Sequence, residues 1–429
     1  MNNKSFFERF YKLTDMEINT PKVQTGWFAV LIKYKMEKQM DFEFTKEQRM
    51  LKDSIREFVD KEIKGEYARD LDEDPSKMFI DDKMWQKIIN LGIFEAAVPP
   101  EYGGIGGSII EDVIITEEFA RGSCAVAMSF GATTGFGARA ILFSGSEEQK
   151  RFYLPKIAEG SIKFAMAVTE PGGGTDILNA LQTTAIPKGD EYIVNGQKVF
   201  ITNAHMADYL LTLVRTDETA EKKSKAMSLF LIPVKDNPGI TIRPLKKFTI
   251  KGASACEIFF NDAKVPAENM LGGLHRGWFE LLKTLNHERI IVAALTNGIG
   301  MAALEDMVIY AKSREAFGRP IGQYQAIQHK IAEVALELEL AKLITYKAAW
   351  LLENKKPCYK EAAMAKLYSS EMAFHAGTKG LDILAGYGVT LEYDMQRYFR
   401  DSRQCTFSPI SNEMAKNFIA EQFGMPKSY

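Results

Sequence analysis

The sequence predicts an α+β fold in which a central antiparallel β-barrel lies between two helical domains. Apolar residues recur at helical spacing over residues 40–163 and 271–429, and with a period of two over residues 164–270. Spacing of three to four residues marks one face of a helix, and spacing of two marks one face of a strand. Helices, then a sheet, then helices again define the α+β class.

Residues 1–39 precede the first predicted helix and form an N-terminal extension. The segment TGWFAVLIKYKMEKQ is mixed in charge and lacks the apolar core and cleavage site of a signal peptide. Because chain termini are often poorly ordered, we expect a poorly ordered extension. Its apolar patch, WFAVLIKYK, leaves a docking or membrane-surface segment as the alternative.

Residues 40–163 are predicted to form the N-terminal helical domain. The segment EQRMLKDSIREFVDKEI places six apolar residues on one helix face: Met50, Leu51, Ile55, Phe58, Val59 and Ile63. MWQKIINLGIFEAAVPPEYGG then predicts a helix, a glycine stop and a Pro/Gly loop at 99–107. A long apolar helix is expected at 109–130.

Residues 164–270 contain the strand-like segments of the predicted barrel. These are FAMAVT, EYIVNGQKVFITNA, DYLLTLVRT, AMSLFLIPV, GITIRPL and CEIFFNDAKVP, with turn residues between them. KGDEY and VNGQK are hairpin signals. We therefore expect a small antiparallel barrel, with a sandwich as the alternative.

Residues 271–429 are predicted to form a four-helix bundle. Apolar spacing of 3.6 residues predicts helices near 277–313, 323–353, 359–384 and 410–423. The connecting segments SREAFGRPIG, NKKPC and AGYGVTLEYD contain the glycines and prolines expected between helices.

Composition excludes several classes of function. The chain is 46% hydrophobic and 26% charged, as is usual for a globular protein, and its net charge of −2 argues against nucleic-acid binding. No apolar run reaches the length of about 18 residues that a membrane span needs, so we expect no transmembrane segment. The four cysteines are far apart and the five histidines show no ligand spacing. We therefore expect no metal site, reduced thiols and a cytoplasmic protein.

Two glycine-rich motifs have different interpretations. In TEPGGGTD (169–176), three glycines follow a predicted strand and allow backbone N–H groups to surround an anion. A flexible turn is the alternative. GIGMAA (298–303) loosely matches a dinucleotide fingerprint, but no strand precedes it. We interpret its glycines as sites of close helix packing.

The segment SREAFGRPIGQYQAIQHK (313–330) carries a second candidate binding site. Arg314, Phe317 and Gln325 surround a Gly–Arg–Pro–Ile–Gly turn. An arginine with backbone amides can bind a pyrophosphate, and a phenylalanine can stack on a ring. A simple helix–helix connection is the alternative.

Glu288, in TLNHERIIVAAL, is the candidate catalytic residue. It shares a predicted helix face with Leu281, Leu285 and Val292, which are all apolar. Desolvation on such a face raises the pKa of a carboxylate toward the range of a general base. Arg289 points elsewhere, because adjacent helix residues do not share a face. A pairing of Glu288 with an arginine from another helix is the alternative.

The order of the motifs resembles the acyl-CoA dehydrogenase family of flavoproteins. PPEYGG, TEPGGGTD, NGQKVFITN, CEIFFNDAKVP, REAFGRPIGQYQAIQ and DILAGYGVTLEYDMQRYFRDSR occur in the family's order over residues 40–429. The resemblance implies a helical N-terminal domain, a central β-barrel and a C-terminal four-helix domain, with FAD between the last two.

The resemblance also implies roles for individual residues. The FAD contacts that it implies are Thr169, Thr175, Phe200, Thr202, Gly386 and Ser411. Arg314, Phe317 and Gln325 would hold the FAD of a neighbouring subunit, which implies a homotetramer or homodimer. Asn286 and Arg289 occupy positions that touch the acyl-CoA in relatives. An electron-transfer flavoprotein is the implied electron partner.

The usual catalytic base of the family is missing. In many relatives a glutamate follows the RD of the last motif, and in this sequence that position is Pro409. Proline has no titratable group and no backbone N–H. A branch that includes enzymes resembling isovaleryl-CoA dehydrogenase carries its base directly before the helix arginine, which here is Glu288. The family chemistry is removal of the α-proton by the base, with hydride transfer from the β-carbon to flavin N5.

Three alternatives to an acyl-CoA dehydrogenase remain open. HERIIVAALTNGIGMAALED and SNEM also resemble enoyl-CoA reductases such as crotonobetainyl-CoA reductase, in which Glu288 would be the acid that protonates the α-carbon. Pro409 motivates a base-independent β-elimination on a CoA thioester. A non-catalytic scaffold that uses the fold for interaction is the third.

Overall fold

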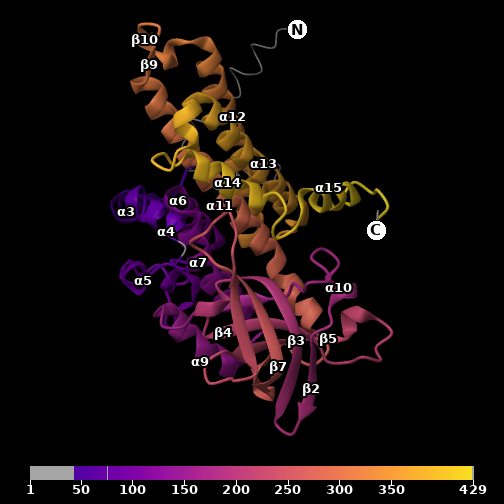
Figure 1. Cartoon of the computed structure of the whole chain (residues 1–429). Helices are drawn as coiled ribbons and strands as arrows, with labels where there is room; N and C mark the ends of the chain where they lie inside the picture. Colours follow the sequence, from indigo (N-terminus) through magenta and orange to yellow (C-terminus); the bar gives the residue numbers. More distant parts are fainter. Residues whose placement is uncertain (1–42, 75, 428–429) are drawn as a thin grey trace, which may run out of the picture. The chain divides into compact units, whose positions relative to one another are not determined.

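The computed structural model describes residues 43–74 and 76–427. From Met50 onward the chain forms one compact unit. The extension predicted over residues 1–39 lies outside the described residues. Figure 1 shows the order of the elements along the chain.

The first helical part contains seven α-helices and one π-helical turn within the described residues. Their bounds are α3 Lys46–Glu62, α4 Glu66–Glu73, α5 Asp82–Ile89, α6 Ile109–Gly122, α7 Cys124–Gly131, a π-helix Ala132–Arg139, α8 Ala140–Ser144 and α9 Glu147–Ala158. The helix expected at 109–130 is two helices, because Ser123 is extended (φ −156°) and ends α6. Ile55 and Val59 on α3 and Ile63 directly after it are buried, whereas Met50 is 62% exposed.

The central part is one mixed sheet. Its strands are β1 Phe164–Ala167, β2 Thr184–Lys188, β3 Glu191–Thr202, β4 Tyr209–Arg215, β5 Met227–Pro233, β6 Ile240–Leu245, β7 Ala255–Pro266 and β8 Met270–Leu271. Their order is β6-β7-β3-β2-β4-β5-β8, with β1 paired to β4. A short helix, α10 Ile177–Ala180, lies between β1 and β2.

The central sheet differs from the predicted antiparallel barrel in two respects. β6 and β8 are edges, so the sheet is open, and β4 pairs in parallel with both β1 and β2. The chain reverses its direction between β2 and β3 and reverses it again between β3 and β4. β4 therefore runs in the same direction as β2 and β1. Alternation in the sequence reports which face of a strand is buried, but not the direction of its neighbour.

One of the two hairpin signals is confirmed. Lys188 pairs with Glu191 around a Gly–Asp turn, as KGDEY predicts. The other signal, VNGQK, lies inside β3 at a register shift. Gly196 has φ 144°, and a Cβ there would come within 2.6 Å of the Thr183 Cα. The glycine is therefore needed for close approach of two strands, not for a turn.

The second helical part contains five α-helices in the described residues, one more than predicted. They are α11 Gly277–Ser313, α12 Gln325–Glu353, α13 Tyr359–Leu384, α14 Met395–Cys405 and α15 Asn412–Glu421. A small hairpin, β9 Glu315–Ala316 and β10 Arg319–Pro320, connects α11 to α12. The prediction misses α14, because α14 buries charged residues such as Arg397 and Asp401, which apolar periodicity cannot reveal.

Two helical stretches in the described part of the chain are long and apolar enough to cross a membrane. They are Cys124–Ser144 and Gly277–Ser313, and 61% and 72% of their most apolar windows are buried inside the protein. Packing in the core therefore accounts for their composition.

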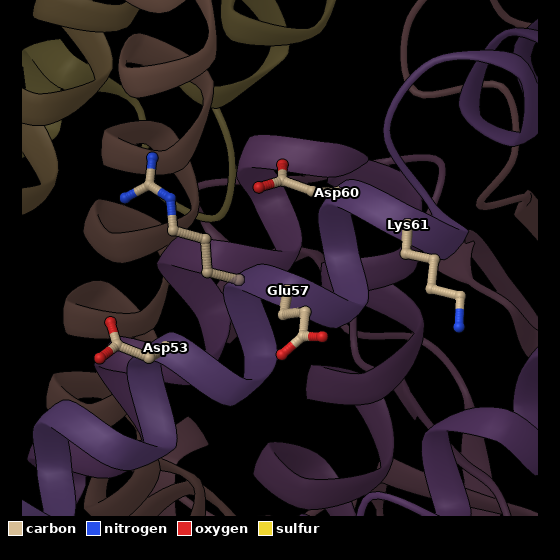
Figure 2. A pocket seen from close by; sticks show the side chains of 5 residues that line it. Asp53, Glu57, Asp60 and Lys61 are labelled. Atoms are coloured by element: carbon tan, nitrogen blue, oxygen red, sulfur yellow. The ribbon is translucent and has the colours of Figure 1, made fainter.

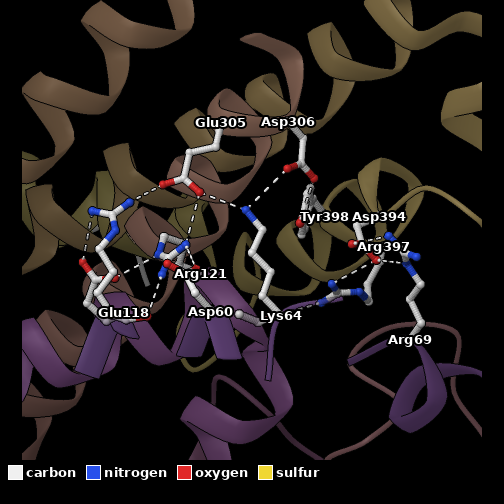
Figure 3. A network of polar contacts seen from close by, with 12 residues as sticks. Asp60, Lys64, Arg69, Glu118, Arg121, Glu305, Asp306, Asp394, Arg397 and Tyr398 are labelled. Atoms are coloured by element: carbon white, nitrogen blue, oxygen red, sulfur yellow. Dashed lines mark hydrogen bonds and ion pairs between the residues drawn. The ribbon is translucent and has the colours of Figure 1, made fainter. Parts of the chain in front are cut away.

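A network of ion pairs joins the two helical parts (Figure 3). The buried Arg121 of α6 contacts Asp60 of α3 at 2.8 Å, Glu118 at 2.9 Å and Glu305 of α11 at 3.2 Å. A second group continues the network to α14; its pairs are Lys64–Asp306, Tyr398–Asp306, Arg69–Asp394 and Arg397–Asp394. Because removing one partner leaves a buried charge unpaired, this network resists separation of the helices.

Candidate active site

Glu288 lies in the first half of α11, with a partly buried carboxylate. Burial raises its pKa to about 7, and the charge of Arg289 lowers the pKa by a smaller amount. Within residues 43–74 and 76–427, no hydrogen bond or ion pair joins Glu288 to another side chain. The alternative of an arginine partner from another helix is therefore not found in this part of the chain. A carboxylate with a pKa near 7 and no fixed partner suits a general acid or base.

The neighbours of Glu288 on α11 separate into an apolar face and a polar face. Leu281 is buried, and Leu285 and Val292 are partly buried, as the spacing predicts. The Arg289 side chain lies over the ring of Phe418 on α15, with its guanidinium carbon 5.1 Å from the ring centroid.

The two predicted substrate-binding residues come together beside Glu288. Arg289 donates from Nη1 to Asn286 Oδ1 at 3.2 Å. Both side chains therefore belong to the turn of α11 that carries the candidate base.

Pro409 lies in the connection between α14 and α15, where it is exposed. It supplies no acid or base to the site. The nearby Ser411, a predicted cofactor contact, caps α15, since its hydroxyl accepts a hydrogen bond from the Met414 N–H at 3.2 Å. The structure thus gives the Ser411 hydroxyl a local role in the helix.

Three predicted cofactor residues meet at the end of β3. The Val199 N–H donates to the Thr169 carbonyl at 2.9 Å, which places Thr169 beside Phe200 and Thr202. Phe200 has φ 59° at a register shift in β3, and its side chain is 66% exposed. A phenylalanine with positive φ is strained, and such strain is common at ligand sites.

Asn203, directly after β3, is a further candidate site residue that the sequence did not indicate. It is 3% exposed with φ 56°, and its Nδ2 donates to Ser129 Oγ of α7 at 3.0 Å. Its Oδ1 is buried with no hydrogen-bond partner in the described part of the chain. A buried acceptor without a partner is costly, so it marks a position where a donor from a bound molecule fits. Only the tertiary contacts reveal it.

A second missed pair, Glu170 and Lys198, holds the glycine turn. Lys198 is fully buried, and its Nζ donates to Glu170 Oε1 at 2.8 Å and to the Val168 carbonyl at 3.0 Å. Glu170 also accepts from the backbone N–H groups of Gln182 and Thr183. A lysine within an apolar strand was the available sequence signal, because such a residue is rarely buried without a partner.

The glycine turn is open at its two outer glycines, whereas a Cβ at Gly173 would lie 2.1 Å from the Ala180 Cβ. A Cβ at Gly172 or Gly174 would meet no atom within 4 Å, and Thr175 is exposed. The turn therefore leaves room for a ligand next to the end of β1. Its geometry agrees with either an anion site or a flexible turn.

The remaining predicted cofactor residues gather at the far end of α11. Arg314 caps α11 and lies over the Tyr387 ring at 5.7 Å, next to Gly386. Phe317, on the β9–β10 hairpin, is 98% exposed with φ 52°, and Gln325 begins α12. A Cβ at Gly386 would meet no atom within 4 Å.

The cofactor residues at the far end of α11 lie far from Glu288 within one chain. At a rise of about 1.5 Å per residue, Glu288 and Arg314 lie about 39 Å apart along α11. Figure 1 likewise shows β9 and β10 at the opposite end of the long helices from the sheet.

A separate groove lies along α3, lined by Asp53, Arg56, Glu57, Asp60 and Lys61 (Figure 2). It is open and contains none of the predicted site residues. No cluster of three or more His, Cys, Asp or Glu side chains in the described residues could hold a metal ion. The four cysteines are free and buried.

Comparison with known proteins identifies the family. Three family models match in order: acyl-CoA dehydrogenase N-terminal domain over residues 45–161, middle domain over 165–263 and C-terminal domain over 275–424. A probable acyl-CoA dehydrogenase of Bacillus subtilis, YngJ, is 38% identical, covering 89% of this chain and 99% of its own length. The chain belongs to the acyl-CoA dehydrogenase family.

Two further relatives show which kinds of enzyme this family member is similar to. The structure of butyryl-CoA dehydrogenase from Megasphaera elsdenii is similar with a TM-score of 0.84 and 33% identity, covering 90% of this chain and 100% of that one. The caffeyl-CoA reductase-Etf complex subunit CarC of Acetobacterium woodii is 36% identical, covering 88% of this chain and 98% of its own. Relatives thus include both dehydrogenases and reductases.

Proposed function

We propose that this acyl-CoA dehydrogenase uses FAD to oxidise an acyl-CoA thioester between its α- and β-carbons, with Glu288 as the base. The observation that carries the proposal is the Glu288 carboxylate, whose pKa burial raises to about 7 and which has no partner in the described residues. Pro409 supports the same assignment, because it leaves the usual position of the base without a titratable group.

The residues at the end of β3 fit a flavin. Phe200 presents an exposed ring on which a flat cofactor can pack, and Asn203 Oδ1 is a buried acceptor that a ring N–H can satisfy. The open glycine turn after Thr169 offers backbone N–H groups to an anion. When bound, FAD supplies the acceptor for the β-hydride.

Glu288 performs the proton transfer of this proposal. Its ionised carboxylate takes the α-proton, which the neighbouring thioester carbonyl makes acidic, and the proton remains on a Glu288 oxygen. Asn286 and Arg289, hydrogen-bonded to each other on the same turn, hold the acyl-CoA beside it. The apolar face around Leu281 and Leu285 excludes water and keeps the pKa of the base near neutrality.

Lys198 gives a first test of the cofactor site. We expect Lys198→Met to weaken FAD retention about tenfold, since Glu170 loses its counter-charge and the turn that carries Thr169 is released. Flavin content and release rate, measured by visible absorbance during dialysis, check this. Lys188→Met, at an exposed lysine of β2, is the matched control. Equal flavin retention in both variants would contradict the role of Lys198.

We also propose that a second subunit completes each FAD site. The support is the position of the β9–β10 hairpin, which carries Phe317 and lies at the opposite end of the long helices from the sheet that carries Phe200 (Figure 1). Phe317 has φ 52° and is 98% exposed in the described part of the chain, as expected for a residue that contacts a partner.

Phe317→Ser tests this assembly. We expect the variant to fold normally and to lose FAD about tenfold more readily, because the exposed ring contributes nothing to its own core. The measurements are flavin-to-protein ratio and molar mass by light scattering. Ile186→Ser, at another exposed apolar residue, serves as control. A monomeric wild-type protein that retains FAD would reject the shared site.

A reductase is the second candidate function, favoured by the 36% identity to the caffeyl-CoA reductase subunit. Glu288 would then donate a proton to the α-carbon. The two directions differ in pH dependence. As a base, Glu288 must be ionised, so the rate of oxidation rises as pH rises through about 7. As an acid, Glu288 must be protonated, so the rate of reduction falls over the same pH range.

An anaerobic titration of the purified flavoprotein with saturated acyl-CoAs tests the proposed function directly. Bleaching of the flavin band by one thioester establishes dehydrogenation. An oxidised flavin with all of them, together with reoxidation of chemically reduced enzyme by an enoyl-CoA, establishes the reductase. Release of a β-leaving group without an electron acceptor would identify elimination instead.

For electron transfer we propose an electron-transfer flavoprotein as partner, in the cytoplasm. The support is a relative that belongs to a complex with such a protein, and four cysteines that are free in the structure. Stimulation of turnover by purified electron-transfer flavoprotein is the corresponding assay.

A further inference from the structure

Lys366 of α13 is fully buried, and all of its hydrogen bonds go to one short segment. Its Nζ donates to the carbonyls of Thr406 (3.4 Å) and Ile410, and to Asn412 Oδ1 at 2.8 Å. The three donors of the ammonium group therefore meet three acceptors within residues 406–412. This segment is the connection between α14 and α15.

Other bonds hold the same segment in shape. The Asn412 N–H donates to the Thr406 carbonyl at 2.9 Å, which closes the segment on itself. Ser370, one helical turn after Lys366, donates to Asn412 Oδ1 at 3.1 Å. The segment is thus fixed to α13 through two side chains, and it carries Pro409 at its centre.

The segment lies on the side of α11 that carries Arg289. The α15 helix follows the segment directly, and its Phe418 ring lies under the Arg289 guanidinium. Burial is the main cause that lowers the pKa of Lys366 to about 8, and the positive charge of Arg289 makes a smaller contribution in the same direction. Arg289 in turn adjoins Glu288.

We propose that Lys366 is a positioning residue that fixes residues 406–412 as an uncharged wall of the acyl site and thereby sets acyl specificity. The proposal rests on the proposed function, with Glu288 as the base. A wall that carries proline in place of a carboxylate affects acyl binding through its shape alone. The shape of the wall distinguishes one acyl group from another only if the wall cannot move. One extra or missing methylene in a hydrophobic pocket changes the ratio of kcat/KM between two substrates by about 10- to 200-fold.

The test compares Lys366→Met with Lys366→Arg and Ser370→Ala. For each variant, kcat and KM are measured with butyryl-CoA, isovaleryl-CoA and 3-phenylpropionyl-CoA. We expect Lys366→Met to reduce the ratio of kcat/KM between the best and the second substrate about tenfold, mainly through KM. Lys366→Arg should restore part of the ratio, and Ser370→Ala should change it less than threefold.

The pH profile separates positioning from a direct chemical role. Because Glu288 is unchanged, the midpoint of kcat near pH 7 should be the same in all variants. Asn412→Ala, which removes one acceptor, provides a milder variant if Lys366→Met does not fold, with an expected change of about threefold. A lower melting temperature with an unchanged substrate ratio and unchanged KM would overturn the proposal and leave Lys366 a purely structural residue.

Failure of the proposed function gives a different result. If no thioester reacts with the wild-type protein, the binding of the same three CoA thioesters is measured by equilibrium dialysis. Loss of discrimination in Lys366→Met would still support the wall, whereas equal discrimination or no binding would overturn it.

Discussion

Replacing Glu288 by glutamine is expected to lower the rate of flavin reduction by acyl-CoA about 10³-fold. Glutamine has nearly the same size but cannot accept the α-proton, and a positioned general base contributes about 10² to 10⁴ in rate. The wild-type rate should rise with pH through about 7, where the Glu288 carboxyl ionises, and the residual rate of the variant should not. Anaerobic stopped-flow measurement of flavin bleaching checks both effects.

Glu288→Asp is the matched control for this variant. It keeps a carboxylate on the same turn of α11 but shortens its reach, so we expect a smaller loss of rate and a surviving pH dependence. Flavin content of all three proteins shows that the cofactor site is intact. An unchanged rate in Glu288→Gln, with any thioester that bleaches the wild-type flavin, would refute the assignment of the base.

Glu288→Gln should also stabilise the fold at alkaline pH. The pKa of Glu288 is raised to about 7 in the folded protein from 4.5 in the unfolded chain, so the folded state binds the proton more tightly. Stability from this group is therefore full below pH 4.5 and falls as pH rises toward 7. We expect Glu288→Gln to be more stable than wild type by on the order of 2 kcal/mol at pH 8 and similar at pH 5, by denaturant unfolding.

Replacing Arg121 by methionine is expected to lower the free energy of unfolding by about 3 to 5 kcal/mol. Methionine fills similar space, but Glu118, which is also buried, loses its nearest cation, and the link between Asp60 and Glu305 is broken. Urea unfolding at fixed flavin content measures the change. The loss is large because the ion network joins α3, α6 and α11, which are distant in sequence.

Arg151→Met is the control for the ion network. Arg151 forms an exposed pair with Glu147 at 2.9 Å on α9, and such pairs contribute less than about 1 kcal/mol. Equal effects of the two substitutions would show that the Arg121 network does not stabilise the joint between the helical parts.

Hydrophobic spacing predicted most of the helices and strands, because burial of one face imposes a period that the chain displays locally. It identified α11 and the apolar face that surrounds Glu288, and burial then raises the pKa of this residue as that face implies. The glycine turn after Thr169 was visible as a run of three glycines, although only Gly173 is closely packed, against Ala180.

Tertiary structure decided the features that depend on contacts between distant residues. The direction of β4 relative to β1 follows from the path of the β2–β3 hairpin, and α14 was hidden because it buries charges that are paired elsewhere. Asn203 and Lys366 look like ordinary polar residues in the sequence, and the position of Lys198 in an apolar strand indicates only that it needs a partner. Their importance comes from acceptors and donors that only the folded chain brings to them, since a buried polar group is stable only when its partners are in place.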